Sequence, residues 1–133
     1  MIPSQRLALL QRSRAIPAGG ASASTPPMSG GDLAPLLPAL LFYVQPPAMT
    51  TTQLPDGETL TYTLVEGNDS TFATTVSTTV LGVQTGAGGV GAAAATFASP
   101  AKLAGGRYIG LKITASASAN AAGVSITLAI AAT

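Results

Sequence analysis

Five carboxylates are the side chains of this sequence best suited to chemistry, and they fall in three separate places. Asp32 stands alone, Asp56 and Glu58 precede a strand-like segment, and Glu66 and Asp69 follow it. Histidine, cysteine and tryptophan are absent, and only 8% of the residues are charged. Nothing in the spacing matches a nucleophile–base pair or a metal-ligand cluster. The sequence therefore predicts no catalytic residue, no metal site and no cofactor, and it favours a structural or binding role over an enzyme.

The two acidic turns leave one alternative open. If Asp56, Glu58, Glu66, Asn68 and Asp69 met at one end of a sandwich, their oxygen atoms could bind Ca²⁺. Ordinary turn chemistry, in which Asp and Asn bond their own backbone, accounts for the same residues and is favoured. A glycosidase pair is excluded, because roughly 26 Å of extended chain separates Glu58 from Glu66.

Two further groups of residues have the composition of known kinds of binding site. Tyr43, Tyr62 and Tyr108 could form a platform on which sugars stack, but packing at sheet faces or in a subunit interface is favoured. The glycine-rich loop at residues 86–89 lacks the Lys, the Ser or Thr and the following helix of a phosphate-binding loop. It therefore predicts no phosphate site.

Charge divides the chain into a basic start and a weakly acidic remainder. Arg6, Arg12 and Arg14 occur in the first 31 residues without any acid, whereas the five acids all lie later. The net charge is only +1 and no aromatic residue is interleaved with the arginines, so no nucleic-acid partner is expected. The apolar runs at residues 7–10 and 33–44 are too short or too broken by proline for a secretory signal or a membrane span. An organelle transit peptide remains a weaker alternative.

The N-terminal third of the chain is predicted to be an extended arm. Ser4 is a suitable cap for a short helix over residues 4–14, and residues 15–39 are rich in Pro, Gly, Ser and Ala without periodicity. We expect an arm over residues 1–39 and a folded domain over residues 40–133. A solvated tail would not normally carry so many leucines, so the arm is predicted to dock on another protein surface. The predicted partner-binding residues are Arg6, Leu7, Leu10, Arg12, Arg14, Leu33, Leu36 and Leu37.

In the remainder of the chain, apolar and polar residues alternate as they do in β-strands. Leu60, Tyr62 and Leu64 alternate with threonines, and the segments at 107–114 and 124–130 show the same period of two. Phe72 is expected to point inward and anchor a turn. The predicted strands are 40–45, 59–65, 74–83, 92–97, 107–114 and 124–130. Short strands separated by turns predict an all-β, antiparallel β-sandwich or jelly roll.

The order of these segments resembles a known family. LTYTLVEG is followed by NDSTFATTV, by a Gly/Ala-rich middle, by GGRYIGLKI and by AGVSITLAI. Over about residues 40–131 this order is similar to the small jelly-roll cement or decoration proteins of tailed-bacteriophage heads. The resemblance implies a structural virion protein on the outer capsid surface, made in the host cytoplasm.

Such a protein would bridge subunits of the major capsid protein and associate with copies of itself as a homo-oligomer, a dimer or a trimer. The alternative is a carbohydrate- or receptor-binding β-sandwich module of a phage tail or fibre. That alternative calls for exposed aromatic residues beside a carboxylate on one sheet, and this chain has few aromatic residues.

Overall fold

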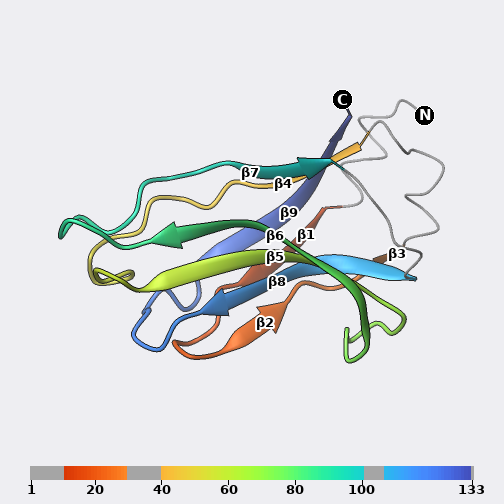
Figure 1. The fold of residues 1–133 in the computed structure, drawn as a ribbon, viewed down its shortest axis with the longest axis horizontal. Coiled ribbons are helices and arrows are strands. Elements are labelled where there is room, and N and C mark those ends of the chain that lie inside the picture. The colour runs from red at the N-terminus through yellow and green to blue at the C-terminus, as the bar shows by residue number, and fades with distance from the viewer. Residues whose placement is uncertain (1–10, 30–39, 101–106, 133) are drawn as a thin grey trace.

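Two antiparallel sheets lie face to face in the computed structural model, which describes residues 11–29, 40–100 and 107–132 (Figure 1). One sheet has the strand order β1-β9-β4-β7, and the other has the order β2-β8-β5-β6 with β3 also paired to β8. The described residues contain no helix, so none of them forms a helical membrane span. In chain order the strands are β1 (Arg12–Ala15), β2 (Ser22–Ser24), β3 (Met28–Ser29), β4 (Leu40–Val44), β5 (Thr59–Gly67), β6 (Thr75–Thr85), β7 (Phe97–Pro100), β8 (Tyr108–Ala115) and β9 (Ser125–Ala132).

The core lies between the two sheets and follows the alternation of the sequence. On β5, Leu60, Tyr62 and Leu64 are buried, while Thr61 and Thr63 are only half-buried on the opposite face. The inward residues of β8 and β9 repeat this pattern, because successive side chains of a strand point to opposite faces. This confirms the predicted all-β fold and the predicted faces of three strands. The inward residues of these two strands are Ile109, Leu111, Ile113, Ile126, Leu128 and Ile130.

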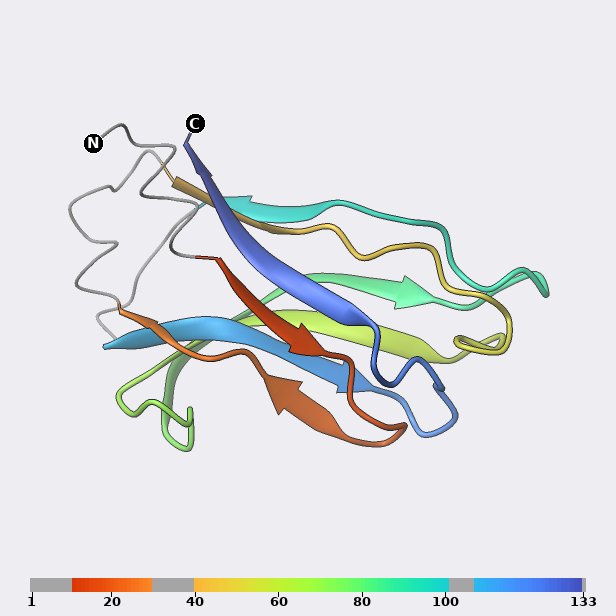
Figure 2. The same ribbon diagram turned by 180° about the vertical axis from the view of Figure 1, so that it is seen from behind.

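Residues 11–29, predicted as part of an arm, are instead built into both sheets (Figure 2). β1 pairs with β9, and β2 and β3 both pair with β8. Ile16 and Met28 are buried in the core. The segment resembled a linker because its strands have only two to four residues, too few to show alternation. In this part of the chain the prediction of an arm is wrong.

The predicted helix over residues 4–14 is also wrong at residues 12–14, which the structure describes as part of a strand. Arg12, Ser13 and Arg14 lie in β1, where their partners on β9 are Leu128, Thr127 and Ile126. The backbone of a strand satisfies its donors and acceptors on the neighbouring strand, which is incompatible with helical bonds to the next turn. Residues 4–10 of the predicted helix, and residues 30–39 of the predicted arm, lie outside the described residues.

One predicted strand begins later than expected. The alanine-rich segment from Ala92 makes a single bridge to Met49, and the strand β7 starts only at Phe97. Phe97 packs against Tyr62 with their ring centroids 6.0 Å apart, and it lies directly beside Gly82 of β6. A Cβ atom on Gly82 would approach the Phe97 ring to 2.2 Å, so glycine is required there. β7 therefore begins where a large side chain can reach the core.

Candidate functional site

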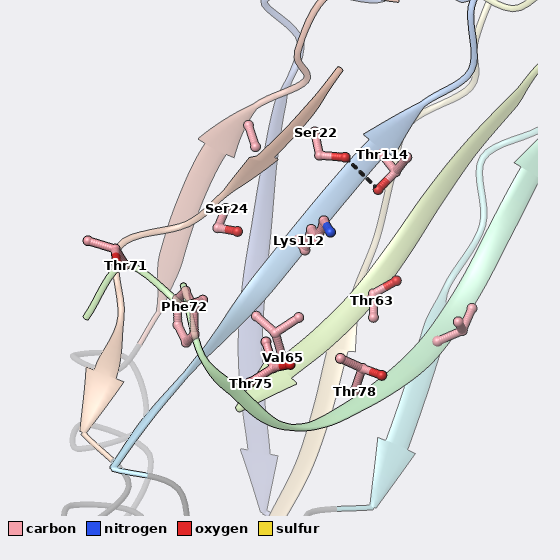
Figure 3. Close-up of a pocket in the computed structure, with 12 residues that line it drawn as sticks. Ser22, Ser24, Thr63, Val65, Thr71, Phe72, Thr75, Thr78, Lys112 and Thr114 are labelled. Atoms are coloured by element: carbon pink, nitrogen blue, oxygen red, sulfur yellow. Dashed lines mark hydrogen bonds between the residues drawn. The ribbon is translucent and has the colours of Figure 1, made fainter. Parts of the chain in front are cut away.

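A hollow of about 570 Å³ lies on the outer face of the β2-β8-β5-β6 sheet, and we call it the outer-face groove (Figure 3). Its floor is made by outward side chains of β5 and β8, and its sides by β2, β6 and the loop between β5 and β6. Hydroxyl-bearing and valine side chains make up most of it. The lining residues are Ser22, Ala23, Ser24, Thr63, Val65, Thr71, Phe72, Thr75, Thr78, Val80, Lys112 and Thr114.

Strand register explains why these side chains share one face. Lys112 of β8 is paired with Ser24 on one side and with Thr63 on the other, and Thr63 is paired in turn with Val80. These four residues therefore form one row across the sheet. Polar groups occupy the β2 side of the row, and the apolar Val80 occupies the β6 side.

The neighbouring row repeats the arrangement. Thr114 is paired with Ser22 and with Thr61, and Thr61 is paired with Val83. The hydroxyls of Ser22 and Thr114 are hydrogen-bonded at 3.1 Å (Figure 3). The exposed Lys112 is the basic side chain of the groove, because the other lining residues carry no charge.

Phe72 forms the end wall of the groove, and it does so from an unusual backbone conformation. Its φ is 58°, in the left-handed region that phenylalanine rarely adopts. The ring lies against β8 at Gly110, where an added Cβ would stand 2.9 Å from the ring tip. Phe72 thus anchors its turn as expected, but against the outer face of the sheet and half-buried. The prediction that it points inward is wrong, because Gly110 leaves room for the ring outside the core.

Asp69 holds this loop in shape. Its carboxylate accepts hydrogen bonds from the Thr71 hydroxyl and from the backbone N–H groups of Ala73 and Thr74, the latter two at 3.0 Å. The Thr71 hydroxyl first, and then the Thr74 and Ala73 N–H groups, lower the pKa of Asp69 to about 2. The charged carboxylate therefore organises the turn that carries Phe72.

A second hollow, of about 360 Å³, lies on the other side of Phe72. It shares Ser24, Thr71 and Phe72 with the outer-face groove, and it is lined by the exposed Arg14 of β1. Within the described part of the chain, neither Arg14 nor Lys112 is engaged in an ion pair. Two cations without an acidic partner among the described residues thus flank one aromatic side chain. This arrangement suits a ligand that carries carboxylates and groups that bond to hydroxyls.

The predicted partner-binding residues are only partly placed by the structure. Arg12 and Arg14 lie on β1, and the Arg12 guanidinium donates to the carbonyl oxygen atoms of Gln11 at 2.9 Å and of Pro27 at 3.2 Å. Arg12 therefore bridges two segments of the fold, and only Arg14 lines a hollow. Arg6, Leu7, Leu10, Leu33, Leu36 and Leu37 lie outside the described residues.

The sequence did not indicate Lys112 as a site residue, and it indicated Phe72 only as the anchor of a turn. Alternation along β8 places Lys112 on the outward face, which the sequence does show. Nothing in the sequence indicates that Ser22 and Ser24 lie beside it, because β2 is only three residues long. Gly110 leaves room for the Phe72 ring, but the two residues lie far apart in the sequence, so no local pattern indicates the end wall.

The two acidic turns do not meet. β5 separates them, so they lie at its opposite ends, and the possible Ca²⁺ site that joined them is contradicted. Glu58 accepts hydrogen bonds from the Ser116 hydroxyl at 2.5 Å and the Ser118 N–H at 3.0 Å, and these lower its pKa. Asp56 accepts one from the Gly89 N–H at 2.9 Å. No three acidic side chains among the described residues gather to hold a metal ion.

The three tyrosines do not form a platform. Tyr62 is buried in the core, Tyr108 begins β8 on the outer face of its sheet, and Tyr43 lies on β4 of the other sheet. Tyr43 lines a separate hollow with Gln45 and Thr127. The tyrosines pack at different sheet faces, which is the arrangement that the sequence favoured.

No protein-family model and no curated protein matches this chain. Among solved structures, the chain is similar to part of one described as the structure of infectious bursal disease virus Gt strain. The two are 16% identical with a TM-score of 0.41, and the match covers 90% of this chain and 27% of that chain. A likeness of this size establishes neither a shared fold nor a shared function.

Proposed function

We propose that this chain is a structural virion protein, and not an enzyme, that decorates and cements a bacteriophage capsid by bridging subunits of the major capsid protein. The protein would be made in the host cytoplasm and would bind to the outer surface of the capsid. Its strands would be connected in the order of a jelly roll. The observation that carries the proposal is the outer-face groove, with Lys112 inside it and Arg14 in the adjoining hollow.

The groove has the properties of a contact surface for another folded protein. Threonine, serine and valine side chains in cross-strand rows offer hydrogen-bonding groups and small apolar contacts on a sheet face. Lys112 and Arg14 would pair with carboxylates of the capsid protein, which sets orientation and speeds association more than it adds affinity. Many copies, each with a modest interface, would stabilise the assembled shell by mass action.

Charge reversal tests this contact. We expect Lys112→Glu and Arg14→Glu each to weaken co-sedimentation with capsids depleted of the protein by roughly tenfold, equivalent to about 1.4 kcal/mol. Both side chains are exposed, so the fold should tolerate the change. The matched control is Arg107→Glu, which reverses an exposed charge that lines neither hollow.

The outcome that contradicts the proposal is equal binding by all three variants, or no binding by the wild-type protein at stoichiometric, repeating positions. Point variants are needed because deletion of residues 1–39 would remove β1, β2 and β3 from the sandwich. Electron micrographs of the decorated capsids provide the positions.

A carbohydrate- or receptor-binding module of a phage tail or fibre is the second candidate, and one observation favours it. Phe72 stands beside hydroxyl-bearing residues in a groove of about 570 Å³, and an aromatic side chain beside polar groups suits a sugar. Retention of the wild-type protein on a glycan array, together with no capsid binding, would replace the cement proposal. Phe72→Ala should then abolish retention.

A further inference from the structure

β6 is an edge strand of eleven residues whose outer backbone side is unpaired within the described residues. One side of the strand is hydrogen-bonded to β5, and no other described backbone group is bonded to it. Its sequence, TVSTTVLGVQT, contains no charged residue and no proline. Three of its valines are exposed: Val76 by 42%, Val80 by 58% and Val83 by 43%. An edge of this kind is a template for pairing with another strand.

The other sheet edges carry features that prevent such pairing. β1 holds Arg12 and Arg14, and charged side chains on an edge strand discourage association. β2 and β3 have three and two residues, and the exposed Pro26 and its neighbour Pro27 separate them. β7 has four residues and ends at Pro100. β6 is the described edge that carries neither a charge nor a proline. Its pairing with β5 is interrupted by two bulges, and the stretch from Ser77 to Val80 between them is regular.

We propose that the free edge of β6 pairs antiparallel with β6 of a second copy of this chain, so that two β2-β8-β5-β6 sheets join into one. A second copy is the occupant that the charge pattern favours. In a two-fold arrangement the regular stretch of β6 from Ser77 to Val80 faces the same stretch of the second copy, so any charge there would face its own copy. β6 has none.

The geometry of the pair follows from the two-fold axis. An axis perpendicular to the joined sheet places one β6 residue opposite the same residue of the second copy, and it keeps both outer faces on the same side. The two outer-face grooves would then lie on one surface, with the Val80 and Val83 side chains of each copy along the seam. Val80 lines the groove, so the pairing would make the two grooves continuous across the seam.

Sedimentation velocity of the purified full-length protein tests the proposal without any capsid, so its result is independent of the proposed function. We expect a dimer at micromolar concentration and a roughly tenfold or greater increase of the dissociation constant in Val80→Lys, because the substitution brings two like charges into the seam. Val90→Lys is the matched control, since Val90 is 77% exposed in the loop that follows β6 and lies outside the strand itself. A wild-type protein that stays monomeric, or a Val80→Lys dimer as strong as the control, overturns the proposal.

Cross-linking keeps the test decisive if Val80→Lys fails to fold. The chain has no cysteine, so single cysteines at Thr78, Val80 and Val83 can be compared with Val90→Cys. We expect a short bismaleimide to give covalent dimers at one or more of the β6 positions and none at Val90, since opposite residues of paired strands lie about 4.5–5.5 Å apart. Equal cross-linking at Val90, or none at any β6 position, would refute the pairing.

Discussion

Tyr62 and Gln84 form a polar contact inside an otherwise apolar core. The Tyr62 hydroxyl donates to Gln84 Oε1 at 2.7 Å, and the Gln84 amide donates to the carbonyl oxygens of Pro47 at 2.9 Å and Ala93 at 3.1 Å. Both side chains are at least 97% buried, and burial raises the pKa of Tyr62. The contact ties β5 and β6 to the β4–β5 and β6–β7 connections, which both run from one sheet to the other, so its loss should affect global stability.

We expect Tyr62→Phe to lower the free energy of unfolding by about 1–3 kcal/mol, because it leaves the buried Gln84 oxygen without its donor. Urea denaturation followed by circular dichroism measures this loss. Tyr43→Phe is the control, since Tyr43 is half-buried on the outer side of the other sheet. Equal losses in the two variants would show that the hydrogen bond to Gln84 does not matter.

Asp69 gives the fold a dependence on acid. Its pKa in the folded protein is about 2, below its ordinary value of 3.8, so its stabilising effect is complete above about pH 4 and is lost as the pH falls through 2. We expect the wild-type protein to lose stability over that window and Asp69→Asn to lose less. Urea midpoints at several pH values measure the difference.

A second variant separates the carboxylate from its donors. Thr71→Val removes the donor that contributes most to the lowered pKa of Asp69, so its stability should vary with pH by an intermediate amount. If Asp69→Asn and the wild-type protein respond to acid in the same way, the hydrogen bonds to Asp69 do not stabilise the turn. Glu58, whose pKa is also lowered, should keep part of the acid response in every variant.

At the scale of elements, the first three strands give a direct test of how much residues 11–29 contribute to the stability of the sandwich. Deletion of residues 1–29 removes β1, β2 and β3, together with the buried Ile16 and Met28. It exposes the edges of β8 and β9 to which those strands are paired. We expect the shortened chain to lose its cooperative thermal transition and to aggregate. Calorimetry and light scattering would detect this, whereas an unchanged transition would mean that residues 11–29 add nothing to the sandwich.

Strands were predictable where they are long enough to alternate and to bury one face. β5, β8 and β9 meet that condition, since each has eight or nine residues. β1, β2 and β3 do not, and their pairing partners lie far away in the sequence. The start of β7 was misjudged because an alanine run has little side-chain pattern, and a single contact of Phe97 with Gly82 decides it.

At the scale of the whole molecule, the candidate site depends on register that no local pattern contains. Lys112, Ser24 and Thr63 become neighbours only because β8 lies between β2 and β5. Of the residues that the sequence predicted to bind a partner, Arg14 alone lines a described hollow. The all-β class could be predicted from alternation, but the groove could not, because it combines strands from both ends of the chain.

The pairing of β1 with β9 also governs how the protein is made. Ser13 and Thr127, whose hydroxyls are hydrogen-bonded at 2.6 Å, are 114 positions apart in the chain. β1 ends at Ala15, and β9 is not complete until residue 132 has been added. During synthesis β1 must therefore remain without this partner until β9 has been made, and the sheet that contains both strands can close only then.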